Sequence, residues 1–390
     1  MGTKQYDSAT DLITFSRTSS ATFLGSNGLL QTAANNIPRI EYDATGAVKG
    51  LLVEEARTNI LTSSGDVTGT GWTQQIGVTS TATGSPFGSY QSASPTSTSS
   101  TEAQSYQIGK TLASGATYVA WSLAKYSAGN GWFSVSLYDT GSNNNRGWFD
   151  LQNGVVGSKD ASIIDYGMID YGDGWWLCWV SKNASSTSGG INLVVTTGDG
   201  AIDSNSGDVV LIAGSQFEQG AFPTSYIPTT GAPATRANDL AEIPTSAFGY
   251  NNDKGSLVID VLTPVADQLM TLAYFNTSTY NNSRGFWKSN SGITAVGTDY
   301  VRSTHDGATT KFTIGQQTQA VYAKLGLSYG DSEKAVRDGG TVLSGTSRYP
   351  NPNRLILGGR DNGYQSQCWI KSIQYYPRQL TDTQLQELTT

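Results

Sequence analysis

Apolar and polar residues alternate along most of this chain, in short runs separated by turns. In the run 132–139, Phe133, Val135 and Leu137 share one face, while Trp132 and Tyr138 share the other. Successive side chains of a strand point to opposite faces, so this pattern predicts a β-strand with one buried face. Similar runs recur roughly every ten residues, which is typical of an antiparallel β-sandwich.

Tight turns join these runs. Gly stands with Asn or Thr in segments 25–30 and 43–50, and Asn153 precedes Gly154. These residue types accept the positive φ of short hairpin turns, so three hairpins are predicted. Only the end of the chain, 380–390, combines a Thr cap with helical apolar spacing. We therefore expect an all-β protein: two antiparallel jelly-roll β-sandwiches in tandem, preceded by N-terminal β-hairpins, with one short C-terminal helix.

Changes in composition along the chain predict four parts. Residues 1–60 hold the first hairpins and are too few for a good core, so we expect them to pack on the next domain. Residues 61–228 form the first predicted sandwich. The Pro-containing stretch 229–245 has the composition of an extended linker, and residues 246–390 form the second sandwich.

Three tryptophans crowd into five positions in the segment GDGWWLCWVSK, residues 172–182. On a strand, Trp176, Cys178 and Val180 are expected to face the core, leaving Trp175 and Trp179 on the opposite face. Those two rings form either a platform open to a glycan or a surface roofed by other elements. The N-terminal hairpins need an apolar surface to pack on, which favours the roof.

Charge and composition narrow the function classes. The formal net charge of the 390 residues is −7, whereas a polyphosphate partner requires a basic surface, so we expect no nucleic acid. We find no run of about 18 apolar residues and no apolar leader segment. The expectation is synthesis in a host cytoplasm without a signal peptide, and no membrane insertion.

Several segments resemble bacteriophage virion proteins. Residues 15–61, FSRTSSATF through PRIEYD to GLLVEEARTNIL, resemble the opening of many phage tail and virion proteins, and residues 213–243 resemble the segment closing the jelly roll there. Residues 147–157 and 173–181 look like strands of a carbohydrate-binding-module jelly roll, although Trp176 and Leu177 stand where Tyr and Arg are usual. Residues 355–389 resemble the end of concanavalin A-like or laminin G-like lectin domains.

The resemblance implies a structural protein exposed on the virion: a tail fibre, head fibre, spike or decoration component that adheres to host surface polysaccharide and contacts other virion proteins. It implies no enzyme. Two alternatives stay open: a polysaccharide depolymerase of glycoside-hydrolase type, and an attachment module that binds no glycan. No heptad run specifies a coiled coil, so a homotrimer of the kind common in fibres would form through sandwich surfaces.

Few residues suit catalysis. His305 is the single histidine and is expected in a surface turn. A catalytic site in which histidine activates a nucleophile would have to use this residue. Cys178 and Cys368 lie in different predicted domains and are expected to be buried and unpaired. The closely spaced Glu and Asp pattern of jelly-roll glycosidases is absent.

Aromatic residues are the better candidates, because ring faces stack on sugar C–H groups while neighbouring polar groups bind hydroxyls. The carbohydrate-binding candidates are Trp132, Tyr138, Trp175, Trp179, Trp287, Arg360, Asp361 and Tyr364.

Polar residues of the phage-type segments form a second set. We expect a structural ion cluster, since half-buried charges must find partners. Its expected members are Arg17, Arg39, Glu54, Glu55, Arg57 and Arg236. No cofactor is expected, and structural calcium stays an open alternative because Asp residues gather in segments 170–173, 199–208 and 251–255 without EF-hand spacing. Turn formation is the simpler interpretation of those residues.

Overall fold

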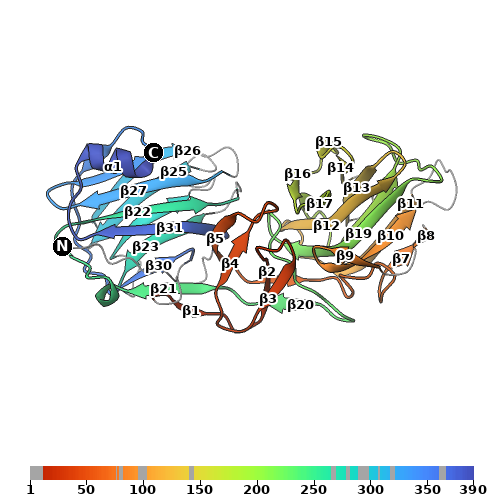
Figure 1. The fold of residues 1–390 in the computed structure, drawn as a ribbon, viewed down its shortest axis with the longest axis horizontal. Helices are drawn as coiled ribbons and strands as arrows, with labels where there is room; N and C mark the ends of the chain where they lie inside the picture. The colour runs from red at the N-terminus through yellow and green to blue at the C-terminus, as the bar shows by residue number, and fades with distance from the viewer. Residues whose placement is uncertain are drawn as a thin grey trace.

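The computed structural model contains two β-sandwiches lying side by side, with N-terminal strands between them (Figure 1). The residues described are 12–75, 77–78, 82–94, 103–139, 145–264, 269–277, 282–288, 298–305, 308–316, 321–359 and 366–390. Strands dominate and one short α-helix closes the chain. The expected all-β class with antiparallel sheets, N-terminal hairpins and a C-terminal helix is therefore confirmed.

Two sheets form the first sandwich. Sheet 1 runs in the order β15 (Val155–Lys159), β14 (Arg146–Asp150), β13 (Trp132–Asp139), β18 (Ser188–Thr196), β11 (Ala103–Thr111), β7 (Thr73–Gln74). Sheet 2 runs in the order β16 (Asp165–Asp170), β17 (Trp175–Asn183), β12 (Thr117–Ala128), β19 (Val209–Gln219), β10 (Gly88–Ser94), β8 (Gly77–Val78), and β9 (Ala82–Ser85) pairs with β10.

The core of the first sandwich follows the predicted alternation. Phe133, Val135 and Leu137 of β13 are completely buried between the sheets. From β17, Cys178 and Val180 enter the same core, and Trp176 packs against its edge. The predicted core face of this strand is confirmed.

The opposite face of sheet 2 is apolar as well, and other segments cover it. Trp175 is only 1% exposed and lies in a cluster with Trp121 and Tyr226. The Tyr90 ring centroid lies 5.6 Å from that of Trp175, and Leu30 of the N-terminal hairpin packs on the same cluster. The second tryptophan face is therefore roofed by side chains of the N-terminal hairpin, of β10 and of the segment around Tyr226.

Two further sheets form the second sandwich. Sheet 3 runs in the order β1 (Thr14–Ser16), β21 (Leu240–Pro244), β30 (Arg354–Leu357), β23 (Met270–Asn276), β24 (Ser283–Lys288), β25 (Thr298–His305), β26 (Ala308–Gln316). Sheet 4 runs in the order β29 (Leu343–Gly345), β28 (Glu333–Arg337), β27 (Ala323–Tyr329), β22 (Gly255–Leu262), β31 (Cys368–Tyr376), β5 (Val48–Val53), β4 (Arg39–Tyr42).

The C-terminal helix α1 (Asp382–Thr389) packs on β27 and β28. Its predicted Thr cap is present as a capping box, in which Thr381 accepts from the Gln384 N–H and the Gln384 side chain accepts from the Thr381 N–H. A 3-10 turn, η2 (Thr245–Ala247), follows β21. No helix within the described ranges is long and apolar enough to span a membrane.

Part of the N-terminal segment lies where we expect it, because Leu30 packs on the first sandwich, and part of it does not. It was expected to pack on the following domain, yet β1 pairs with β21 and β5 pairs with β31, so both join sheets of the second sandwich. The hairpin of β2 (Ala21–Leu24) and β3 (Leu30–Ala33) lies between the sandwiches (Figure 1). Strand edges carry unpaired N–H and C=O groups, and these additions satisfy them with strands from far away in sequence.

The predicted linker 229–245 is also more ordered than expected. It contains β20 (Ala234–Arg236), which pairs with β6 (Arg57–Asn59), and it contains β21 of sheet 3. Its composition resembles that of a linker, but both of its ends are fixed by strand pairing.

Candidate functional site

The structure buries two of the predicted glycan-binding rings. Trp175 is 1% exposed beneath its roof, and Trp287 has no exposed surface. The Trp287 ring stacks on Tyr300 with a centroid separation of 6.0 Å. Of the two alternatives for Trp175, the structure has the roof and not the glycan platform. Trp287 as a carbohydrate-binding candidate is wrong, because its ring packs against other side chains and leaves no face for a ligand.

The remaining candidates are scattered. Trp132 and Tyr138 share one face of β13 but stand six positions apart, about 20 Å along a strand, so they cannot contact one sugar ring together. Trp132 lies against the backbone of Gly157, and Trp179 is half-buried against Gly167. Arg360, Asp361 and Tyr364 lie outside the described residues.

Tyr138 does line a shallow cleft on the outer face of sheet 1. The cleft has a volume of about 190 Å³ and is lined by Gln104, Tyr106, Ile108, Tyr138 and Asn192. Strand β18 lies between β11 and β13, with Asn192 opposite Tyr106 and Gly190 opposite Tyr138. The two tyrosines therefore stand on either side of β18, which carries only the Asn192 amide and the bare backbone of Gly190 at these positions.

A chain of amide side chains fixes the floor of this cleft. Asn192 Nδ2 donates to Gln104 Oε1 at 2.5 Å, and Gln104 Nε2 donates to Gln75 Oε1 at 2.7 Å. A glutamine amide has two lone pairs and two N–H groups, so each end of Gln104 keeps capacity for a further hydrogen bond. The cleft thus combines aromatic rings with oriented neutral donors and acceptors.

A β-bulge in β11 shapes the rim. The pairing of β11 with β18 shifts between Gln107 and Lys110, which places Ile108 on the surface with 42% exposure. Gly190 accommodates this bulge, since a Cβ there would lie 2.1 Å from Gln107 O and 2.7 Å from Ile108 Cα. The missing side chain at position 190 is therefore a steric requirement and also helps to hollow the cleft.

Four of the five lining residues were not predicted. Gln104, Tyr106 and Ile108 alternate in AQSYQIGK, and Asn192 interrupts the apolar run INLVV on its non-core face. These are faint signals that could have been noticed. Which residues of β11, β18 and β13 become neighbours cannot be read from the sequence.

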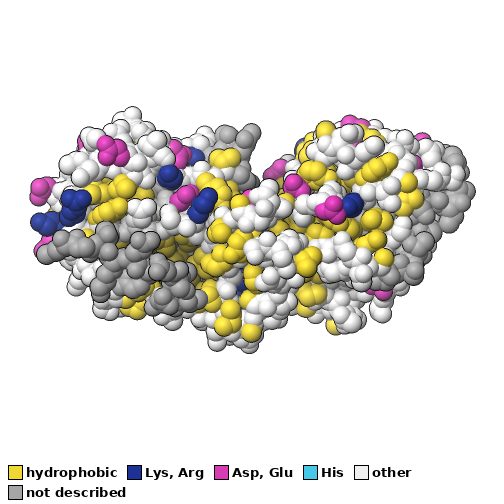
Figure 2. Space-filling model, viewed as in Figure 1, with side chains coloured by type: hydrophobic (Ala, Val, Ile, Leu, Met, Phe, Trp, Pro, Cys, Tyr) yellow, Lys and Arg dark blue, Asp and Glu magenta, His cyan; other side chains and the backbone are white. Residues whose placement is uncertain are grey.

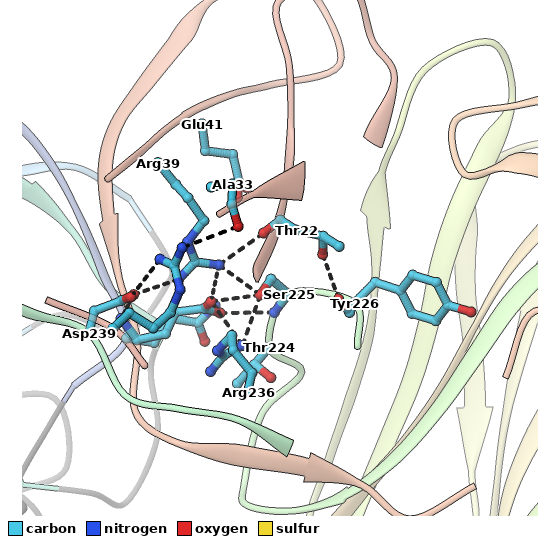
Figure 3. A network of polar contacts seen from close by, with 12 residues as sticks. Thr22, Ala33, Arg39, Glu41, Thr224, Ser225, Tyr226, Arg236 and Asp239 are labelled. Atoms are coloured by element: carbon cyan, nitrogen blue, oxygen red, sulfur yellow. Dashed lines mark hydrogen bonds and ion pairs between the residues drawn. The ribbon is translucent and has the colours of Figure 1, made fainter. Parts of the chain in front are cut away.

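The predicted ion cluster contains a fully buried core between the sandwiches (Figure 3). Arg39 is paired with Glu54 at 2.8 Å and with Asp239 at 2.5 Å, and none of these side chains is exposed. Arg17 contacts Asp239 at 3.0 Å, and Arg236 contacts Glu54 at 2.9 Å. The structure brings together four of the six predicted members and adds Asp239, which was missed.

Ser225 connects the ions. Its N–H donates to Glu54 Oε1 at 2.8 Å and its hydroxyl donates to Oε2 at 2.7 Å, while the same hydroxyl accepts from Arg39 and Arg236. Burial alone would raise the pKa of Glu54, but Arg236, Arg39 and the Ser225 hydrogen bonds lower it to about 2. Glu54 is therefore ionised across the physiological range, as structural ion networks require.

The other two predicted members form a separate pair. Arg57 contacts Glu55 and the Gln219 carbonyl, and its guanidinium lies 5.2 Å from the Phe222 ring centroid. Both side chains sit where β6 passes the end of β19, and the Glu55 carbonyl accepts from Arg236, which links this pair to the Arg39 network.

Two other carboxylates in the described part of the chain, Asp299 and Glu333, are buried beside basic side chains. Asp299 pairs with Lys288 at 3.5 Å and with Arg337 at 3.0 Å, and Glu333 lies 3.7 Å from Arg284. Burial raises the pKa of Asp299 and raises that of Glu333 to about 7. Both carboxylates are at most 1% exposed, so a polysaccharide has no access to them.

The cysteines, the histidine and the Asp-containing segments are the remaining candidates for catalysis or metal binding. Cys178 and Cys368 are buried and free, as predicted. His305 ends β25 and is half-buried. Within the described ranges no group of three or more His, Cys, Asp or Glu side chains is placed to hold a metal. Asp199 instead accepts from the Ser158 N–H and hydroxyl, and Asp170 accepts from the Gly172 N–H.

Comparison with known proteins gives weak structural likenesses only. No protein-family profile matches the chain, and no curated protein matches it. Among solved structures, the Ruminococcus gnavus IT-sialidase CBM40 is 15% identical with a TM-score of 0.30, over 37% of this chain and 87% of that one. The NanB sialidase of Streptococcus pneumoniae is 17% identical with a TM-score of 0.32, over 38% of this chain and 26% of that one. Trypanosoma rangeli sialidase is 12% identical with a TM-score of 0.31, over 77% and 60%. Likenesses at this level identify no ligand and no activity for this chain.

Proposed function

We propose that this protein is a non-enzymatic adhesion component of a phage virion, exposed on the particle, that binds host surface glycans through the cleft between Tyr106 and Tyr138. The observation that carries the glycan part is the composition of that cleft: two half-buried tyrosines flank amide side chains held by hydrogen bonds. Rings of this kind stack on sugar C–H faces, and fixed amides bind hydroxyls. A cleft of about 190 Å³ is smaller than an ordinary small-ligand pocket, so it suits contact with a single sugar ring.

Binding at such a shallow site is weak for a single copy. A particle that displays many copies gains avidity, because the second contact becomes intramolecular. The cleft lining contains no carboxylate, whereas glycoside hydrolysis needs two. Adhesion without cleavage therefore fits this surface better than a depolymerase does.

The virion part of the proposal rests on the sequence segments 15–61 and 213–243. Residues of these two segments meet in the Arg39 network, which supports their role as one scaffold that joins the two sandwiches. Labelled imaging of intact phage particles tests this part, and absence of the protein from purified particles would refute it.

A glycan microarray at high protein density tests the glycan part. We expect binding that Tyr138→Ala and Tyr106→Ala abolish and that Tyr138→Phe largely retains, because the stacking ring remains. Reducing-sugar release should stay at background. Glycan binding that persists in both alanine variants would show that the site lies elsewhere. If the wild type binds no glycan on the array, the glycan proposal is wrong.

A further inference from the structure

A second hollow lies on the outer face of sheet 4, beside helix α1. Its volume is about 290 Å³. In the view of Figure 2, hydrophobic, basic and acidic side chains lie close together on the sandwich that carries β22, β27 and β31 in Figure 1. The side chains used below are Asp260, Lys324, Lys371, Ser372 and Gln374, and Leu388 of α1 forms part of the rim. We call this hollow the sheet 4 groove.

Strand register places the polar groups of the groove in a row. Asp260 of β22 lies opposite Lys324 of β27 on one side and opposite Ser372 of β31 on the other. The pairing of β22 with β31 shifts beside Asp260, and the extra residue on β31 is Lys371. A bulge re-aims a side chain, and here it adds an exposed ammonium next to the row.

The ammonium groups of the two lysines, Lys324 and Lys371, have different partners. Lys324 Nζ donates to Thr390 O at 2.6 Å. Lys371 makes no ion pair with the described residues, and its Nζ lies 5.0 Å from the Tyr322 ring centroid. Lys371 is thus the cation that the groove offers to a ligand.

Asp260 is the complementary acceptor. Its Oδ1 is buried and receives no hydrogen bond from the described part of the chain. Burial raises the pKa of Asp260, and Lys371 and Lys324 act against that rise. The Asp260 side chain as a whole is half-buried and lines the groove. One carboxylate beside two lysines is a poor cation site, so the ligand group that fits is an uncharged O–H or N–H donor.

Nearby charges are already balanced. Lys49 pairs with Glu41 at 2.9 Å on the neighbouring strands β5 and β4. The groove itself holds two ammonium groups and one carboxylate, and the Asp338 carboxylate lies close enough to act on the pKa of Asp260, so the groove lacks the surplus positive charge that a polyanion needs.

We propose that the sheet 4 groove binds a neutral saccharide by a vicinal diol, whose hydroxyls donate to Asp260 and accept from Lys371, with Gln374 and Ser372 supplying further hydrogen bonds. A hydroxyl both donates and accepts, so two adjacent ones satisfy the carboxylate and the ammonium together. This site goes beyond the proposed function, because it lies in the other sandwich and does not use the Tyr106–Tyr138 cleft.

A glycan microarray with the Tyr106→Ala/Tyr138→Ala double variant tests this site separately from the first cleft. We expect at least one neutral glycan to remain bound, and Asp260→Asn and Lys371→Ala each to weaken that binding by about tenfold or more, as for hydrogen bonds to charged groups. Asp331→Asn and Lys254→Ala are matched controls at exposed positions outside the groove and should leave it unchanged.

Three outcomes would overturn the proposal: no neutral glycan bound in this background, equal binding by the Asp260 and control variants, or binding confined to acidic glycans and abolished by salt. Thermal melting of each variant shows whether it folds. If the wild type binds glycans and the double variant does not, the first cleft is supported and the groove proposal fails. If the double variant keeps a glycan whose binding Asp260→Asn weakens, the groove is supported whatever the first cleft does.

Discussion

Ser225 and Glu54, 171 positions apart in sequence, form a double hydrogen bond: the Ser225 N–H and hydroxyl donate to the two Glu54 oxygens at 2.8 and 2.7 Å. Both residues belong to segments that lie between the sandwiches. The contact joins the connection between β5 and β6 to the strand-free segment that follows β19, and three arginines and Asp239 surround it. The polar joint is therefore built from the segments that precede and follow the first sandwich in the chain.

Removing one member of this network should be costly. We expect Glu54→Gln to lower the free energy of unfolding by about 3–5 kcal/mol, because buried arginines lose their counter-charge. Urea denaturation measures the change. The matched control is Glu242→Gln, which breaks a pair to Arg354 with 25% exposure on each side and should cost about 1 kcal/mol or less. Equal losses in both variants would contradict a special role for the network.

Stability should also depend on pH through Glu54. Its folded pKa is about 2, below the value near 4.3 of an unfolded glutamate. The stabilisation is therefore complete above pH of about 5 and is lost as pH falls toward 2, amounting to about 3 kcal/mol.

Urea titrations at pH 6, 4 and 3 test this sign. The difference in unfolding free energy between wild type and Glu54→Gln should shrink steadily as the solution becomes more acidic. A difference that stays constant or grows on acidification would show that Glu54 is not held ionised.

Trp175 should contribute to the stability of the fold and not to glycan binding. It is 1% exposed beneath Tyr90 and its neighbours, so we expect Trp175→Ala to cost about 3–5 kcal/mol. Glycan-array binding measured well below the lowered melting temperature should match that of the wild type. Loss of glycan binding by a variant that keeps its stability would restore this ring as part of a binding surface.

Gly190 should be intolerant of a side chain. A Cβ there would meet Gln107 O at 2.1 Å and Ile108 Cα at 2.7 Å, so Gly190→Ala must displace the bulge that forms the rim of the Tyr106–Tyr138 cleft. We expect a loss of about 1–3 kcal/mol in stability together with weaker glycan binding.

Gly198→Ala is the matched control, since nothing lies within 4 Å of a Cβ at that position. Its stability should change by about 0.5 kcal/mol or less. Normal glycan binding by Gly190→Ala would show that the bulge does not shape the site.

Local patterns in the sequence determined the strands, the turns and the helix. The alternation around Phe133 and Cys178 identified the core faces, because a strand fixes its side-chain directions with a period of two whatever it pairs with. The Thr381 cap and the Asn153–Gly154 hairpin were predictable for the same reason: each depends on contacts within a few residues.

Long-range pairing was decided only by the tertiary structure. Nothing local says that β5 adds to β31, that segment 229–245 supplies β21, or that Asp239 completes the Arg39 network. The same limit applies to the sites. Trp175 and Trp287 have the right chemistry for a sugar but are covered by distant segments, whereas Tyr106, Asn192 and Tyr138 become neighbours only because β18 lies between β11 and β13. Exposure and adjacency depend on how the whole chain packs, and a residue's own neighbours in sequence carry little information about either.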